Sequence, residues 1–241
     1  MIPNPDQRPT LQAGAQQLGI TLDVAQLAQF SAYRSILSEW NSRIDLTNVP
    51  EAEFEQRHFL ESLTVTLACD LKRITSCIDV GTGAGFPGLP LKIAFPHLQM
   101  TLVDSTRKRV DFLTEVISVL GLVGIVAIHA RAEEIAHDPR YRAAFDLVTA
   151  RAVARLPILI EYLLPFAKIG GSVVCMKGSG VAEEFSESQE GLKILGGRVD
   201  PPISCTTPGD SLIRTLVRID KAAETPVQYP RVTSKILKRP L

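Results

Sequence analysis

The sequence is poor in residues arranged to build covalent or metal sites. Its four cysteines and four histidines show neither the spacing of a disulfide framework nor that of zinc ligands. The cysteines are Cys69, Cys77, Cys175 and Cys205. We therefore expect no disulfide framework and no bound metal.

Long apolar segments are also missing. The longest strongly apolar stretch covers residues 116–128, which is too short to span a bilayer, and it contains Gly121 and Gly124. The first residues show neither the basic segment nor the apolar core of a signal peptide. We expect a cytoplasmic protein with no membrane partner.

The 241 residues carry no net charge, because 26 basic side chains balance 26 acidic ones. The apolar share of 45% and the charged share of 22% are typical of a folded globular protein and exclude a disordered chain. The balance hides an asymmetry, since residues 221–241 hold five basic side chains against Glu224. They are Lys221, Arg231, Lys235, Lys238 and Arg239. Any attraction to a nucleic acid is therefore expected to be local.

Residues 1–72 are predicted to form a helical cap. Between Asp23 and Ile44 the apolar residues recur three or four positions apart, which predicts one face of an amphipathic helix. Pro50 suits the first turn of a second helix, expected to run to about Cys69.

Residues 73–241 are predicted to form an α/β domain. Strands are expected at 76–80, 98–104, 123–129, 145–149 and 172–176, helices at 106–120 and 157–168, and a late edge or antiparallel strand at 213–219. Alternating strands and helices predict a doubly wound, mostly parallel sheet. Ligands of such sheets bind at the carboxyl ends of the strands.

A glycine-rich turn follows the first of these strands. Gly81, Gly83, Gly85 and Gly88 allow a sharp turn and a close approach to a ligand, and the spacing fits either a dinucleotide or S-adenosylmethionine. Asp79 lies just before the turn. It would repel a pyrophosphate but suits the positive charges of S-adenosylmethionine, so the second cofactor is favoured.

Other strand ends carry further candidates. Asp104, at the end of the second strand, can accept hydrogen bonds from ribose hydroxyls. Ala132 leaves room for a flat base, whose edge Glu133 can meet. Arg151 and Lys177 follow the fourth and fifth strands, where cofactor and substrate are expected to meet.

Several of these segments together resemble the RsmG family (glucose-inhibited division protein B), bacterial enzymes that make N7-methylguanosine in 16S ribosomal RNA. The resemblance rests on residues 78–88, 102–105, 131–134, 149–152 and 176–178, together with Trp40-Asn41, Leu46-Thr47-Asn48 and Arg57-His58-x-x-Glu61-Ser62-Leu63. The sequence departs from the family pattern at Asp45 and Glu61, where the family usually has asparagine and aspartate.

The resemblance implies a Rossmann-like class I methyltransferase with S-adenosylmethionine as its cofactor. It implies cofactor contacts from Gly81, Phe86, Asp104, Ser105, Thr106, Ala132, Glu133 and Arg151. The residue analysis adds Asp79, Gly83 and Gly85 to the cofactor site, and Arg151 and Lys177 to position the substrate. The partner implied is 16S ribosomal RNA or an assembling small subunit, and a monomer is expected.

The expected chemistry needs no general base, because guanine N7 has an exposed lone pair. The sequence contains neither the Asn/Asp-Pro-Pro-Tyr/Phe box of amine methyltransferases nor the Pro-Cys nucleophile of cytosine-C5 enzymes. Alignment of the reacting atoms would supply most of the rate enhancement.

Phosphate contacts are expected from basic side chains outside the cofactor site. The candidates are Arg57, His58, Arg231, Lys235, Lys238 and Arg239. Deletion of residues 231–241 is expected to weaken RNA methylation and to leave cofactor affinity nearly unchanged. Two other hypotheses stay open at this point, an NAD-binding oxidoreductase and a non-catalytic ribosomal RNA assembly factor.

Overall fold

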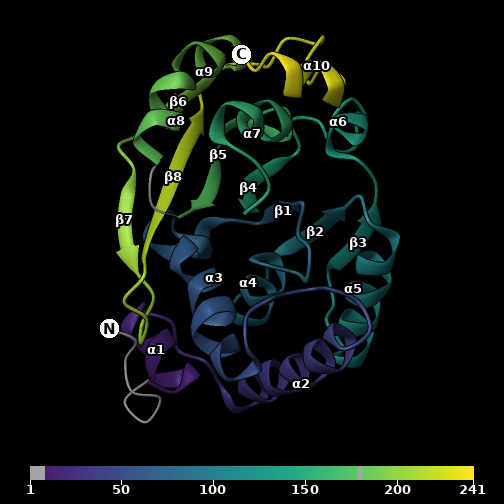
Figure 1. The fold of residues 1–241 in the computed structure, drawn as a ribbon, viewed down its shortest axis with the longest axis vertical. Helices are drawn as coiled ribbons and strands as arrows, with labels where there is room; N and C mark the ends of the chain where they lie inside the picture. The colour runs from purple at the N-terminus through teal and green to yellow at the C-terminus, as the bar shows by residue number, and fades with distance from the viewer. Residues whose placement is uncertain (1–8, 179–180) are drawn as a thin grey trace.

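A computed structural model describes residues 9–178 and 181–241 and contains one eight-stranded sheet. The strands are β1 (Ser76–Val80), β2 (Gln99–Asp104), β3 (Ile125–His129), β4 (Phe145–Arg151), β5 (Ala167–Lys177), β6 (Gly197–Val199), β7 (Ile203–Thr206) and β8 (Ile213–Lys221). Their order is β3-β2-β1-β4-β5-β8-β6, and β7 pairs with β8 as well (Figure 1).

The sheet is parallel from β3 to β5 and antiparallel beyond β5. The chain order reverses between β1 and β4, so the carboxyl ends of these two strands flank the switch point of the sheet. The expected doubly wound fold is confirmed. β8 is antiparallel but is not an edge strand, because it pairs with β5 on one side and with β6 and β7 on the other.

Helices cover both faces of the sheet (Figure 1). Those of the domain are α4 (Gly88–Ala94), α5 (Arg107–Val119), α6 (Ala132–Ile135), α7 (Leu156–Leu163), α8 (Val181–Glu187), α9 (Gln189–Leu195) and α10 (Thr233–Lys238). One apolar cluster packs α4, α5 and the N-terminal helices against the sheet, and a second packs α7 and α9 against it. The alternation of buried strands with amphipathic helices builds these two layers.

The first expected cap helix is present as α2 (Val24–Asn41), preceded by the short α1 (Leu11–Gln17). Asp23 begins α2 with a capping box, in which its carboxylate and the Gln26 side chain accept from each other's backbone N–H. Phe30, Tyr33 and Leu37 are buried along the predicted apolar face. They belong to the same apolar cluster as the α4 side of the sheet, so α2 packs directly against this part of the fold.

The second expected cap helix is wrong as one continuous element. Residues 51–73 form short helical pieces: η2 (Glu51–Glu53), η3 (Glu55–Leu60), α3 (Glu61–Leu63), η4 (Thr64–Leu67) and η5 (Leu71–Arg73). The π-helical turn of η3 buries His58 and Phe59, and α3 buries Glu61. This irregular segment therefore delivers polar side chains to the interior, which the apolar periodicity does not reveal.

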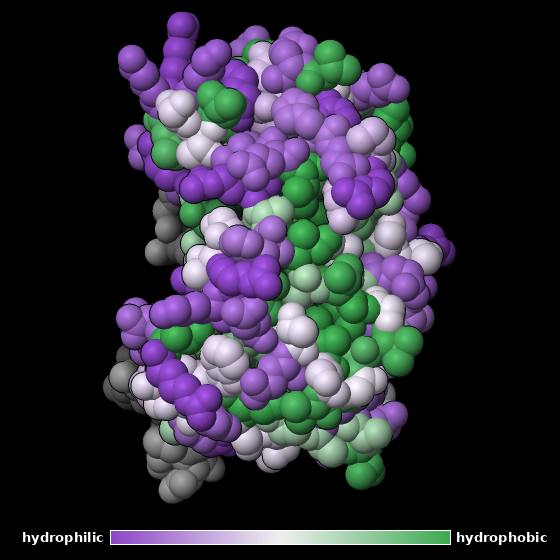
Figure 2. Space-filling model, turned by 90° about the vertical axis from the view of Figure 1, so that its right-hand side faces the viewer, coloured by the Kyte–Doolittle hydropathy of each residue, from purple (hydrophilic) through white to green (hydrophobic). Residues whose placement is uncertain are grey.

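The side of the molecule formed by the β3 edge carries an apolar band between polar regions (Figure 2). Val119, Val123 and Val126 are among the large hydrophobic side chains that remain exposed. None of the helices in the described ranges is long and apolar enough to cross a membrane.

Candidate functional site

The glycine-rich turn connects β1 to α4 at the switch point of the sheet. Gly81, Gly83 and Gly85 have φ of 68°, 59° and 94°, a region that side chains rarely adopt. A Cβ on Gly81 would lie 2.7 Å from Val153, whereas a Cβ on Gly83 would meet nothing within 4 Å. Gly81 is therefore fixed by packing, and Gly83 faces open space.

The buried carboxylate of Asp79 fixes this turn by hydrogen bonds. The residue is 0% exposed, and its carboxylate accepts from the Thr82 hydroxyl at 2.6 Å, from the Gly88 N–H at 2.9 Å and from the Thr149 hydroxyl at 2.9 Å. Burial raises the pKa of Asp79 to about 6, against the opposing effect of these three donors. The expected cofactor contact of Asp79 is thus replaced, in this arrangement, by contacts that organise the turn.

Asp104 joins the turn to the end of β2. Its two carboxylate oxygens accept from the Gly83 N–H at 2.9 Å and from the Thr106 N–H at 2.8 Å, and the residue is 3% exposed. Oδ2 also lies 3.6 Å from Arg109 Nη1, whereas Oδ1 keeps a second lone pair. Asp104 can therefore fix the turn and still accept from a ligand hydroxyl.

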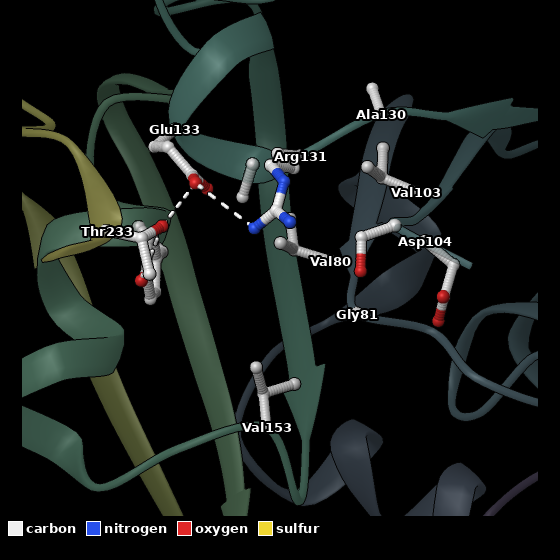
Figure 3. A pocket seen from close by; sticks show the side chains of 12 residues that line it. Val80, Gly81, Val103, Asp104, Ala130, Arg131, Glu133, Val153 and Thr233 are labelled. Carbon is white, nitrogen blue, oxygen red and sulfur yellow. Dashed lines mark hydrogen bonds and ion pairs between the residues drawn. The ribbon is translucent and has the colours of Figure 1, made fainter. Parts of the chain in front are cut away.

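A pocket of about 180 Å³ opens beside these two strand ends. Its lining is Val80, Gly81, Val103, Asp104, Ser105, Ala130, Arg131, Ala132, Glu133, Val153, Tyr162 and Thr233. Glu133 and Thr233 face each other on one side, and Gly81 and Asp104 lie on the other (Figure 3).

The pocket brings together five of the expected cofactor residues: Gly81, Asp104, Ser105, Ala132 and Glu133. Those outside its lining are Asp79, Gly83, Gly85, Phe86, Thr106 and Arg151. Tyr162 and Thr233 line it without having been expected. Nothing in the sequence around them signals a ligand, since they reach the pocket only through the packing of α7 and α10.

A second group of side chains, here named the Arg151 cluster, lies where the cap meets the end of β4. It consists of Arg151, His58, Glu61, Phe86 and Arg214. The Arg151 guanidinium donates to His58 Nδ1 at 3.1 Å, lies 3.6 Å from Glu61 Oε1 and stands 4.6 Å from the centre of the Phe86 ring. Arg214 Nε lies 3.0 Å from Glu61 Oε2, so this carboxylate bridges two arginines.

His58 is buried in this cluster and does not reach the surface as expected of an RNA contact. It is 5% exposed, and its ring stacks on Phe86 with 4.3 Å between the ring centres. Burial and the positive charge of Arg151 lower the pKa of His58 to about 3. Because Nδ1 accepts from Arg151, Nε2 donates to the Thr47 hydroxyl at 2.8 Å. A buried, neutral imidazole whose two nitrogens are both hydrogen-bonded within the protein cannot serve as a phosphate contact.

Glu61 and Arg214 belong to the site although neither was singled out as a site residue. Glu61 occurs in the Arg57-His58-x-x-Glu61 motif, and this motif was the available signal. Arg214 lies on β8, and only the antiparallel pairing of β8 with β5 brings it to this end of the sheet.

Lys177 binds the loop that follows β4. Its ammonium group donates to the Ala154 carbonyl at 2.8 Å and lies 2.8 Å from Glu184 Oε2. Glu184 also accepts from the Leu156 N–H at 2.6 Å, at the start of α7. In this loop Ala152 has a φ of 56°, so the backbone is held in a rare conformation directly after Arg151. Lys177 therefore supports the shape of the site.

The basic C-terminal residues divide into buried and exposed groups. Lys221 is 3% exposed and donates to the carbonyls of Leu164 and Leu195, both at 2.9 Å. Arg231 binds the fully buried Glu161 through two nitrogens, at 2.6 and 2.8 Å. Arg231 therefore has an internal partner, and its expected phosphate contact stays a prediction.

Lys235, Lys238 and Arg239 are exposed on and after α10. Arg57 is half-exposed and lies 3.0 Å from Glu53. These four remain the accessible cations among the expected RNA contacts. Within the described ranges, no three histidine, cysteine, aspartate or glutamate side chains gather in a way that could hold a metal.

Solved structures with similar folds include a ribosomal protein L11 methylase from Lactobacillus delbrueckii subsp. bulgaricus. It is 17% identical, with a TM-score of 0.52, over 74% of this chain and 82% of that one. The YcgJ protein from Bacillus subtilis is 12% identical, with a TM-score of 0.54, over 69% of this chain and all of that one. At these identities the likeness concerns the fold alone.

Sequence comparisons carry the assignment further. The ribosomal RNA small subunit methyltransferase G of Alkaliphilus metalliredigens is 44% identical over 232 residues, 96% of this chain and 97% of that protein. The protein of the same name from Leuconostoc mesenteroides subsp. mesenteroides is 46% identical over 227 residues, 92% of this chain and 94% of that protein. A family model described as rRNA small subunit methyltransferase G matches residues 26–213. The chain therefore belongs to the rRNA small subunit methyltransferase G family.

Proposed function

We propose that this protein transfers a methyl group from S-adenosylmethionine to N7 of a guanine in 16S ribosomal RNA. The observation that carries the proposal is the position of the glycine turn, tied to two strand ends by Asp79 and Asp104. The turn opens on one side to the pocket, and the Arg151 cluster lies at the end of the adjacent strand β4. Family membership supports this reading over an NAD-dependent oxidoreductase.

The pocket suits the adenosine part of the cofactor. Asp104 offers a lone pair for a ribose hydroxyl, and Ala130 and Ala132 line the pocket with small side chains beside it. Glu133 supplies an acceptor at the far side, as an amino-substituted base requires (Figure 3). The turn at Gly83 leaves open space where a Cβ would stand, which allows a ligand close to the backbone.

S-adenosylmethionine supplies an electrophilic methyl group carried on a sulfonium. The residues of the chain then have to orient the base and exclude water. Arg151 is held over Phe86 and between His58 and Glu61. It offers a fixed cation for an RNA phosphate or for the carbonyl oxygen of guanine. No proton has to be removed from N7, and this agrees with the neutral, fully bonded state of His58.

The RNA itself would meet the exposed cations Arg57, Lys235, Lys238 and Arg239. Such contacts give affinity that depends on salt and fix orientation without reading sequence. An enzyme that acts on ribosomal RNA would work in the cytoplasm, on free 16S RNA or on an assembling subunit.

The test uses 16S RNA and small subunits from a strain that lacks this methylation, each incubated with tritiated S-adenosylmethionine. We expect label in N7-methylguanosine after digestion, and loss of this label in Asp104→Ala and Arg151→Ala. Cofactor binding without label in either substrate would instead support a non-catalytic assembly factor. Binding of NADH in place of S-adenosylhomocysteine would overturn the proposal.

A further inference from the structure

The C-terminal segment is anchored along its length to the rest of the domain. Arg142 donates from Nη1 to the Tyr229 carbonyl and from Nη2 to the Thr225 carbonyl, each at 2.8 Å. His137 lies 2.9 Å from the Pro230 carbonyl. Carbonyl groups bound in this way by side chains from the region after α6 fix the path of residues 225–230.

A second anchor places α10. Arg231 pairs with Glu161 of α7, whose carboxylate is fully buried, and also donates to the Arg239 carbonyl at 3.0 Å. Ile236, on the inner face of α10, is 0% exposed. A buried, hydrogen-bonded ion pair of this geometry is costly to break from one side, so the segment has a defined position.

As a result Thr233 stands at the mouth of the pocket. Its hydroxyl donates to Glu133 Oε1 and accepts from the Tyr162 hydroxyl at 3.3 Å. Figure 3 shows Thr233 and Glu133 joined across this side of the pocket. Arg131 Nη1 lies 3.9 Å from the same Oε1, so one oxygen of Glu133 makes both its side-chain hydrogen bond and its ion pair with the described residues.

We propose that Thr233 positions Glu133 to accept a hydrogen bond from the 6-amino group of adenine, and that Tyr162 orients the Thr233 hydroxyl. This inference rests on the proposed use of S-adenosylmethionine. Glu133 Oε2 accepts no hydrogen bond from the described residues and is left for the base. A carboxylate held in this way accepts from a 6-amino purine and repels a 6-oxo purine, which presents an oxygen at the same place.

The proposal changes the role of the C-terminal segment. Residues 231–241 were expected to serve RNA and to be separable from the cofactor site. The contacts of Thr233 make them one wall of the pocket, so their deletion would lower cofactor affinity too.

The test measures binding of S-adenosylhomocysteine and S-inosylhomocysteine to the full chain by calorimetry. We expect the wild type to prefer the adenosyl compound by at least about 20-fold. Thr233→Val keeps the shape but lacks the donor, so it should bind the adenosyl compound about fivefold more weakly and lose part of the preference. Thr233→Ser, which restores the hydroxyl, should stay within about twofold of wild type, as should the neighbouring exposed control Ser234→Ala.

The outcomes separate the two proposals. Thr233→Val with wild-type affinity and preference would overturn the role of Thr233 alone. A wild type that binds neither compound would overturn the proposed cofactor. If Thr233→Val does not melt cooperatively, Tyr162→Phe takes its place, because it removes only the hydroxyl that binds Thr233. Tyr162→Phe should lower the affinity for S-adenosylhomocysteine about twofold, and an unchanged affinity would count against the proposal.

Discussion

The pocket and the Arg151 cluster occupy neighbouring strand ends but are assembled differently. The floor of the pocket comes from three successive strand ends and the turn between β1 and α4. The Arg151 cluster draws on η3, α3, the glycine turn, β4 and β8, whose residues are up to 156 positions apart, as with His58 and Arg214. A site built by consecutive βα units leaves a local motif, whereas a site built by packing leaves scattered single residues.

The two regions also hold their buried ionisable groups in opposite ways. Asp79 is surrounded by three donors that favour its carboxylate, although burial still raises its pKa to about 6. His58 is kept neutral, because burial and Arg151 lower its pKa to about 3. The three donors thus offset only part of the cost of burying the Asp79 carboxylate, and the Arg151 cluster excludes a second cation next to its arginine.

The largest effect expected from a single change is that of Asp79→Ala. It leaves the Gly88 N–H and two threonine hydroxyls without their acceptor, which should cost about 3 kcal/mol of unfolding free energy and abolish methylation. In Asp79→Asn, the amide oxygen can accept from Gly88 and Thr82 while the NH₂ group donates to Thr149, so stability should change by less than about 1 kcal/mol. Urea unfolding measures the free energy of unfolding of both variants. An equal decrease in Asp79→Ala and Asp79→Asn would contradict the assigned contacts.

Arg151→Ala should separate the two regions. The residue does not line the pocket, so the affinity for S-adenosylhomocysteine should stay within about threefold, while the methylation rate falls at least about 100-fold because the cation that orients the RNA substrate is lost. Arg151→Lys should recover little, since a lysine cannot reproduce the guanidinium contacts with His58 and Phe86. Parallel loss of affinity and rate would show that the two regions form one site.

The sequence predicted the region with a local motif far better than the packed one. The glycine turn, Asp104 and Ala132-Glu133 each follow a strand, so the rule for α/β sheets places them together. Thr233 and Arg214 carry no such signal, because α10 and β8 reach the site through pairings of distant segments.

Charge alone misled the interpretation of the tail for a related reason. Lys221, Arg231 and Lys235 look alike in a basic segment, but the first two are tied to buried carbonyls and to a buried carboxylate. A sequence shows the number of positive charges, and only the fold shows which of them have internal partners.

His58 and Asp79 have pKa values shifted in opposite directions, so acidification changes the stability of the fold in opposite ways through these two groups. Between pH 7 and pH 5 the unfolded chain protonates His58 but the folded chain does not, so this group destabilises the fold by about 2 kcal/mol on acidification. Asp79 acts the other way, because the folded chain takes up its proton near pH 6 and the unfolded chain only near 3.8, which adds about 1.4 kcal/mol at pH 5.

Denaturant unfolding at pH 7 and pH 5 measures this pair of effects. Asp79→Asn should lose more stability on acidification than the wild type does, and His58→Gln, whose amide oxygen can still accept from Arg151, should lose less. Variants with the pH dependence of the wild type would contradict the assigned protonation states.

The smallest expected effect comes from the outer face of α10, which tests whether the pocket region also holds RNA. Lys235 and Lys238 are exposed, whereas Thr233 on the same helix lines the pocket. The double variant Lys235→Ala/Lys238→Ala should bind 16S RNA about threefold more weakly at low salt and show a salt dependence reduced by about one to two counterions. Its affinity for S-adenosylhomocysteine should equal that of the wild type, because neither ammonium contacts the pocket lining. An unchanged salt slope would place the RNA entirely on the side of the Arg151 cluster, and Arg57 would then be the next cation to replace.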